Sequence, residues 1–153
     1  MKTKSPEKKL DEFIAKYSPE IRELARAALD RMRTRLRGAI EMVYDNYNAL
    51  VIGFGPNERA SDAIFSIVLY PRWVSLFFLQ GAGLPDPKKL LKGSGKVVRH
   101  VVLQDAEDLE EPAIQELIDC ALKRARTPLD ETQPSRMVIK SVSEKQRPRR
   151  PRA

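Results

Sequence analysis

The sequence contains little of what most enzymes and secreted proteins need. Among its 153 residues there is one cysteine, Cys120, and one histidine, His100. A single cysteine cannot form an intramolecular disulfide, so nothing indicates an oxidising compartment. The two residues fall on different predicted elements, without the spacing of a metal site or a nucleophile–base pair. We therefore expect no enzyme activity, no metal site and no cofactor, and we expect Cys120 to be a packed, inert thiol.

Long apolar runs are also missing. The longest one, residues 63–79, is interrupted by Pro71 and Arg72 and is too short to span a bilayer. The first residues carry charge but no apolar segment of the kind found in secretion signals. These absences predict a cytoplasmic protein that does not bind membranes.

Positive charge is concentrated at the two ends of the chain. Residues 1–9 hold four lysines and one acid, and residues 136–153 hold seven basic residues and one acid, which gives +3 and +6 of the total of +7. The body between them is therefore slightly acidic, at −2. We predict a basic N-terminal arm over residues 1–9, a folded domain over 10–126 and a disordered basic tail over 127–153.

Three helices are predicted from start signals and apolar spacing. Ser5 and Ser18 are each followed by Pro-Glu, a combination typical of the first turn of a helix, and Pro112 opens a third amphipathic segment. Gly38 is the expected terminator of the second helix. That helix also carries an arginine stripe on its polar side, formed by Arg22, Arg26, Arg33 and Arg37. We interpret the stripe mainly as a solvated face, with phosphate contact as the alternative.

Four strands are predicted, at residues 49–54, 63–70, 73–79 and 97–103, because these runs are apolar and bounded by turn residues. Residues 39–48 contain Asp and Asn and are predicted to be a linking segment. The fold class expected from this order is α+β. An antiparallel sheet of about four strands would be covered on one face by the N- and C-terminal helices.

The strand at 73–79 is apolar on both sides. Trp73 and Phe77 are expected to point to one face of the sheet, and Val74, Leu76 and Phe78 to the other. The Trp73 and Phe77 face is either covered by loops of the chain itself or is the contact surface for a protein partner, a ligand or a second copy.

A glycine-rich turn before the last predicted strand gathers positive charge. Gly93 and Gly95 precede Lys96, Arg99 and His100, and this group is a candidate site for an anion or an acidic partner. In the alternative interpretation the glycines supply positive φ, and the cations pair with acids of the loop at residues 105–111.

The C-terminal tail is the candidate site for polyanions. Its arginines Arg147, Arg149, Arg150 and Arg152 lie among prolines and polar residues, which should leave their charges available. We predict weak, sequence-independent nucleic-acid binding there, without base stacking, because no aromatic residue lies in the tail.

Part of the sequence resembles the YdhG-like family, small bacterial domains of unknown function. The resemblance covers roughly residues 20–126 and is most specific in the strand at 73–78 and the segment after it. The residues that carry it are Trp73-Val74-Ser75-Leu76-Phe77-Phe78, Gly81, Pro85-Asp86-Pro87, Leu90-Leu91, Gly93-Ser94-Gly95-Lys96 and Arg99-His100-Val101. It implies helices on one face of an antiparallel sheet and a fold shared with frataxin and the YjbR proteins.

These expectations support two functions. The first is a non-enzymatic binding module for an unidentified partner, with a basic tail for polyanions or acidic proteins. The second is a frataxin-like iron chaperone for iron–sulfur cluster assembly, which would use the acidic loop at residues 105–111 and the last helix. The iron function fits less well, because the long helix carries the arginine stripe where frataxins have an acidic ridge.

Overall fold

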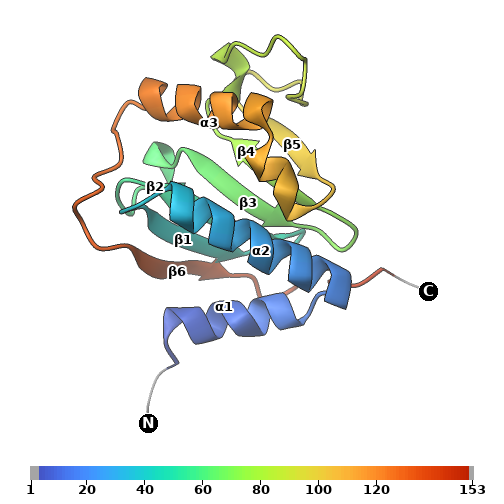
Figure 1. Cartoon of the computed structure of the whole chain (residues 1–153). Helices are drawn as coiled ribbons and strands as arrows, with labels where there is room; N and C mark the ends of the chain where they lie inside the picture. Colours follow the sequence, from blue (N-terminus) through green and yellow to red (C-terminus); the bar gives the residue numbers. More distant parts are fainter. Residues whose placement is uncertain (1–3, 152–153) are drawn as a thin grey trace.

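A computed structural model describes residues 4–151 of the chain and has an α+β fold. Within these residues three helices lie on one side of a six-stranded sheet whose strand order is β5-β4-β3-β2-β1-β6 (Figure 1). The helices are α1 (Pro6–Ala15), α2 (Pro19–Arg35) and α3 (Pro112–Arg124). The strands are β1 (Ile40–Asp45), β2 (Leu50–Gly55), β3 (Phe65–Leu69), β4 (Val74–Phe78), β5 (Arg99–Leu103) and β6 (Arg136–Val142). Short 3₁₀ turns are η1 (Ala60–Asp62), η2 (Gly81–Gly83) and η3 (Ala106–Glu110).

The predicted helix starts are confirmed. Each α-helix has proline in its first turn, and the Ser5 hydroxyl accepts a hydrogen bond from the Lys8 amide at 3.2 Å. Gly38 follows α2 with a backbone φ of +79°, which residues other than glycine rarely adopt. Among the described residues no helix is both long enough and apolar enough to cross a membrane.

The sheet differs from the prediction in size and in type. The four predicted strands are present as β2 to β5 and pair antiparallel, but β1 and β6 are added on one side. Strand β6 pairs parallel with β1, so the sheet is mixed. The prediction of a linking segment at residues 39–48 is wrong, since most of this segment forms β1. Its polar residues Glu41 and Asp45 are buried against charged partners.

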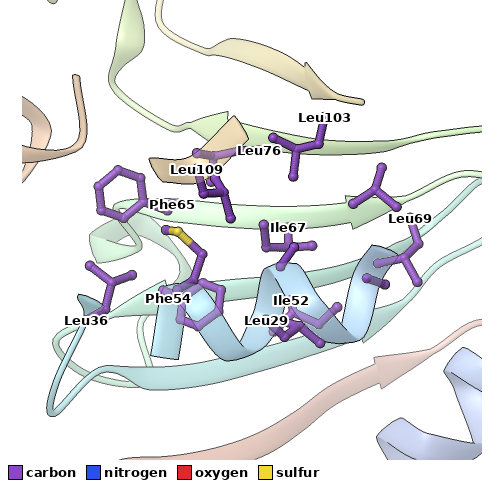
Figure 2. Close-up of a cluster of buried hydrophobic side chains, with 14 of the residues drawn as sticks. Leu29, Leu36, Ile52, Phe54, Phe65, Ile67, Leu69, Leu76, Leu103 and Leu109 are labelled. Atoms are coloured by element: carbon purple, nitrogen blue, oxygen red, sulfur yellow. The ribbon is translucent and has the colours of Figure 1, made fainter. Parts of the chain in front are cut away.

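The predicted two faces of β4 are confirmed. Val74, Leu76 and Phe78 are fully buried under the helices, whereas Trp73, just before the strand, is 43% exposed. The core is continuous across the sheet, and Figure 2 shows Leu29 of α2 in one cluster with Ile52 of β2 and other strand side chains. Phe65 and Phe78 meet edge to face in this core, with ring centroids 5.5 Å apart.

The predicted disorder of residues 127–153 is wrong for much of that segment. Residues 136–142 form β6, and Met137 and Ile139 pack against the core. Beyond β6, the Ser143 amide donates to the Asp45 carbonyl at 2.9 Å, and the Arg147 amide donates to the Tyr47 carbonyl at 2.9 Å. The composition of this segment predicts disorder because it is rich in proline, charged and polar residues; the partners that order it lie 78 to 104 residues earlier in the chain. The folded unit therefore extends well past residue 126, and it includes α1 from Pro6 onward.

We predict that a chain ending at Arg126 is markedly less stable than the full chain. Its β1 edge would lose β6, and the buried Asp45 carboxylate would keep only Lys16, at 3.5 Å, in place of Arg149; removing one partner of a buried ion pair costs up to about 3–5 kcal/mol. Urea denaturation of the two chains measures the difference. Equal denaturation midpoints, or rapid proteolysis of residues 136–150 in the full chain, would show that this segment is not part of the folded unit.

Candidate functional site

The sheet face opposite the helices, here called the open face, has a floor of small side chains. In the strand register Val51 of β2 lies opposite Val68 of β3, and Val68 lies opposite Ser75 of β4. Residues directly opposite one another point to the same side of a sheet. Ser66 of β3 is on this face as well, because it lies opposite Phe77. Because valine and serine side chains are short, the middle of the open face lies lower than its edges.

Larger aromatic side chains stand on the β4 side of this floor. Trp73 stacks on Tyr70, with centroids 4.8 Å apart and the rings inclined by 29°. Phe77 stacks on His100 of β5 in a similar way, at 5.0 Å and 24°. Two stacked pairs therefore form one wall of the open face, and nearly half of the Trp73 surface still faces solvent.

The opposite wall is formed by the β1–β2 hairpin and the C-terminal segment. Asn46, Tyr47 and Asn48 lie at the hairpin tip, and residues 143–151 run beside them. The Arg147 guanidinium lies 5.6 Å from the centre of the Tyr47 ring, a cation–π contact. Tyr47 is 49% exposed, so this wall also presents an aromatic surface to solvent.

Between the two walls lies a groove of about 1190 Å³, here called the open-face groove. Three arginines line it, Arg72, Arg147 and Arg150, and no aspartate or glutamate does so within residues 4–151. At another part of the same sheet face the loop carrying η1 covers the surface. A methyl group on Gly55 would lie 3.0 Å from Ala63 there. The chain itself thus covers one part of the open face, whereas Trp73 and Tyr47 at the edges of the groove are 43% and 49% exposed.

A buried ion pair holds the C-terminal wall in place. Asp45 is fully buried and Arg149 is 5% exposed, and an Arg149 Nη donates to Asp45 Oδ1 at 2.9 Å. The guanidinium also donates to the Asn46 carbonyl and, at 3.3 Å, to the Tyr47 carbonyl. Arg149 Nε is the one guanidinium nitrogen for which the described residues supply no acceptor. These bonds attach the end of the chain to the hairpin tip.

Tyr17 connects this ion pair to the sheet. Its hydroxyl donates to the Leu69 carbonyl at 2.9 Å and accepts from the Leu50 amide at 3.1 Å, so it joins the ends of β2 and β3. The Arg149 guanidinium lies 5.7 Å from the centre of the Tyr17 ring. Burial raises the pKa of Tyr17 to about 12, although the nearby Arg149 charge acts in the opposite direction.

The structure divides the predicted tail site. Arg147 and Arg150 line the open-face groove on the side of the hairpin and the C-terminal segment, and Arg72, which the sequence did not single out, lines it next to Trp73. Arg149 is not available to a polyanion, because its charge is already paired with Asp45 in the interior. Arg152 lies outside the described residues.

The predicted anion site in the glycine-rich turn does not converge on one point. Arg99 donates to two carbonyls of its own turn, those of Gly95 at 2.6 Å and Val98 at 2.8 Å. His100 instead stacks on Phe77 at the open face. Lys96 and Gly95 are exposed, and nothing lies within 4 Å of a Cβ placed on Gly95.

Gly93 behaves as the alternative interpretation of this turn expects, with a φ of +130°. The strand bridge between Lys92 and His100 places the Lys92 charge near the imidazole. Burial lowers the pKa of His100, and the Lys92 charge lowers it further. Within residues 4–151 no group of three His, Cys, Asp or Glu side chains has the geometry to hold a metal ion.

The arginine stripe of α2 is a largely solvent-exposed face, as expected, and three of its four arginines also bind partners within the molecule. Arg33 makes a two-bond contact with the Glu41 carboxylate, at 2.9 Å for each bond. Arg26 pairs with Asp11 of α1 at 3.0 Å, and Arg22 donates to the Tyr17 carbonyl at 2.9 Å. Sequence spacing identified the stripe but not these partners.

No family model matches the chain, and the searches of curated proteins and of solved structures gave no match.

We predict that Asp45 and Arg149 are strongly coupled in stability. Asp45→Asn leaves a buried guanidinium without a counter-charge, at a cost of about 3–5 kcal/mol. Arg149→Met costs less, because Lys16 still lies 3.5 Å from the carboxylate. The double variant should be more stable than the sum of the two losses implies. A double-mutant cycle by urea denaturation measures the coupling, with the exposed Lys145→Met as control; additive losses would contradict it.

We also predict that Tyr17 makes stability fall at high pH. Because its pKa is about 12 when folded and about 10 when unfolded, the unfolded chain ionises first between these values. The Tyr17 contribution is therefore complete below pH 10 and declines as the pH rises toward 12. Tyrosinate absorbance of the wild type minus that of Tyr17→Phe should titrate near 12. A difference curve centred near 10 would contradict the buried hydroxyl.

Proposed function

We propose that this protein is a non-enzymatic cytoplasmic binding module that holds polyanions in the open-face groove. The observation that carries the proposal is the charge of the groove, which has three arginines and no carboxylate among its described lining residues. Two of these arginines come from the basic C-terminal segment and Arg72 comes from the slightly acidic body, so the fold brings the three charges together. Attraction of a phosphate chain to clustered arginines is strong and depends on salt.

The proposal changes the role of the C-terminal segment. Arg147 and Arg150 act from a fixed position, because backbone and side-chain bonds hold residues 143–150 to the hairpin and to α1. Arg150 Nε, for example, donates to the Lys16 carbonyl at 3.2 Å. These two arginines are therefore largely ordered by folding, so that binding a ligand costs less conformational entropy.

The YdhG-like assignment is part of the same proposal. It is supported by the sequence resemblance over roughly residues 20–126 and by helices that lie on one face of the sheet. The YdhG-like pattern covers the aromatic wall, whereas the C-terminal wall lies beyond it. The proposed site thus joins the YdhG-like body to a segment outside the resemblance.

Binding of a base-free polyanion tests the proposal. The probe is a fluorescein-labelled abasic deoxyribose-phosphate strand, followed by fluorescence anisotropy across a salt series. We expect Arg147→Gln/Arg150→Gln to weaken binding and to reduce the salt dependence by about 0.7 in the log–log slope for each lost phosphate contact.

The matched control is Lys140→Gln/Lys145→Gln, which removes two charges from the same segment without touching the groove. This control should retain the wild-type slope apart from a small general loss. Equal losses in the two double variants would show that binding is diffuse and that the groove is not the site.

A further inference from the structure

The open-face groove has a second property that phosphate binding alone does not use: exposed aromatic rings at both of its walls. Trp73 stacks on Tyr70 and still has 43% of its surface exposed. On the hairpin side, Tyr47 is 49% exposed beside the guanidinium of Arg147. These are among the few large hydrophobic side chains that the described residues leave open to solvent.

Each exposed ring has an arginine beside it. Arg72 precedes Trp73 in the chain and lines the same groove, and Arg147 lies over the Tyr47 ring. Proteins that bind single strands need this alternation, because unpaired bases stack on aromatic rings while the adjoining phosphates meet cations. Between the two rings the floor of the groove carries only the short side chains of valine and serine.

Resting on the proposed polyanion function, we infer that the groove binds single-stranded nucleic acid, with bases stacked on Trp73 and Tyr47 and phosphates on Arg72, Arg147 and Arg150. The expectation of binding without base stacking was based on a tail that contains no aromatic residue. The fold corrects that premise by placing the tail arginines beside the aromatic side chains of the sheet and the hairpin.

Other occupants fit the groove less well. A second copy related by two-fold symmetry would place three arginines against the same three arginines, and like charges across an interface are costly. An acidic peptide would satisfy the arginines but has no flat rings to cover Trp73 and Tyr47. A duplex keeps its bases stacked inside and presents only phosphates to these rings.

The position of the acidic surface limits where the strand runs. On the other side of Arg72 and Trp73 lies a separate hollow whose lining includes Glu20, Glu23 and Asp105. Carboxylates repel phosphates, so the strand is confined to the open-face groove, between Trp73 and the C-terminal wall. Arg72 and Trp73 mark the border between the two surfaces.

The closing experiment compares oligothymidylate with an abasic strand of equal length, both fluorescein-labelled, on the full chain. Oligothymidylate does not pair with itself, so the two probes differ only in their bases. We expect oligothymidylate to bind about five- to a hundredfold more tightly, as stacking of one base or slightly more would give. Trp73 is the only tryptophan, so its fluorescence should be quenched by oligothymidylate and not by the abasic strand.

Trp73→Ala should remove most of the advantage of oligothymidylate and leave the affinity for the abasic strand unchanged, and Trp73→Phe should restore part of it. If Trp73→Ala fails to fold, the fluorescence of the unaltered chain still decides the question.

The contrary results are distinct. Equal affinity for the two probes without quenching would overturn the single-strand inference while leaving the polyanion function intact; no binding of either probe would overturn both. Two further outcomes would overturn the inference in favour of another occupant. One is a poly-glutamate peptide of equal charge that binds as tightly as oligothymidylate. The other is concentration-dependent dimerisation that buries Trp73 without ligand.

Discussion

The buried carboxylate of Asp45 requires compensating cations, which are Lys16 next to α1 and, at a shorter distance, Arg149 near the C-terminal end of the chain. Asp45 ends β1 on the helix side of the sheet, and Arg149 reaches it from 104 residues further along. To arrive there the chain must leave α3, pass the edge of β1 and add β6 to the sheet (Figure 1). A buried ion pair often adds little net stability compared with apolar residues, but removing one partner is costly. The pair therefore favours the fold in which Arg149 reaches Asp45 over folds in which it does not. The hairpin tip, the C-terminal segment and the Tyr17 bridge all meet at this point.

The same ion pair builds the proposed site. With Arg149 fixed in the interior, Arg147 is held two residues before it and Arg150 one residue after it, both at the rim of the open-face groove. One arginine of the segment is therefore a structural anchor, and its neighbours are the proposed binding groups. Side chains of the sheet and of the hairpin provide the rings. In this proposal, neither the sheet face nor the C-terminal segment would bind a single strand by itself. The sheet face contributes only Arg72 as a cation to the groove, and the C-terminal segment contains no aromatic residue.

The elements set by local signals could be predicted from the sequence, whereas those set by distant partners could not. Proline at each helix start and the apolar runs of β2 to β5 identify these elements without reference to the rest of the chain. Strand β1 was missed because Glu41 and Asp45 are polar on a buried face, a pattern that is stable only with Arg33 and Arg149 in place. For the site, the sequence placed Trp73 and Phe77 on one face and identified the tail arginines. It could not show that the two sets meet, nor that Arg149 is buried.

The most direct test of this account is a nuclear magnetic resonance titration of the ¹⁵N-labelled full chain with oligothymidylate. If the sheet and the C-terminal segment form one site, the Trp73 indole signal, the amides of Ser66 and Val68 and the amides of Arg147 and Arg150 should all shift along one saturation curve with a common Kd. The amide of Arg149 should stay protected from solvent exchange throughout. Shifts confined to residues 136–151, with an unchanged Trp73 signal, would show instead that the C-terminal segment binds as an independent tail and that the groove is not a binding site.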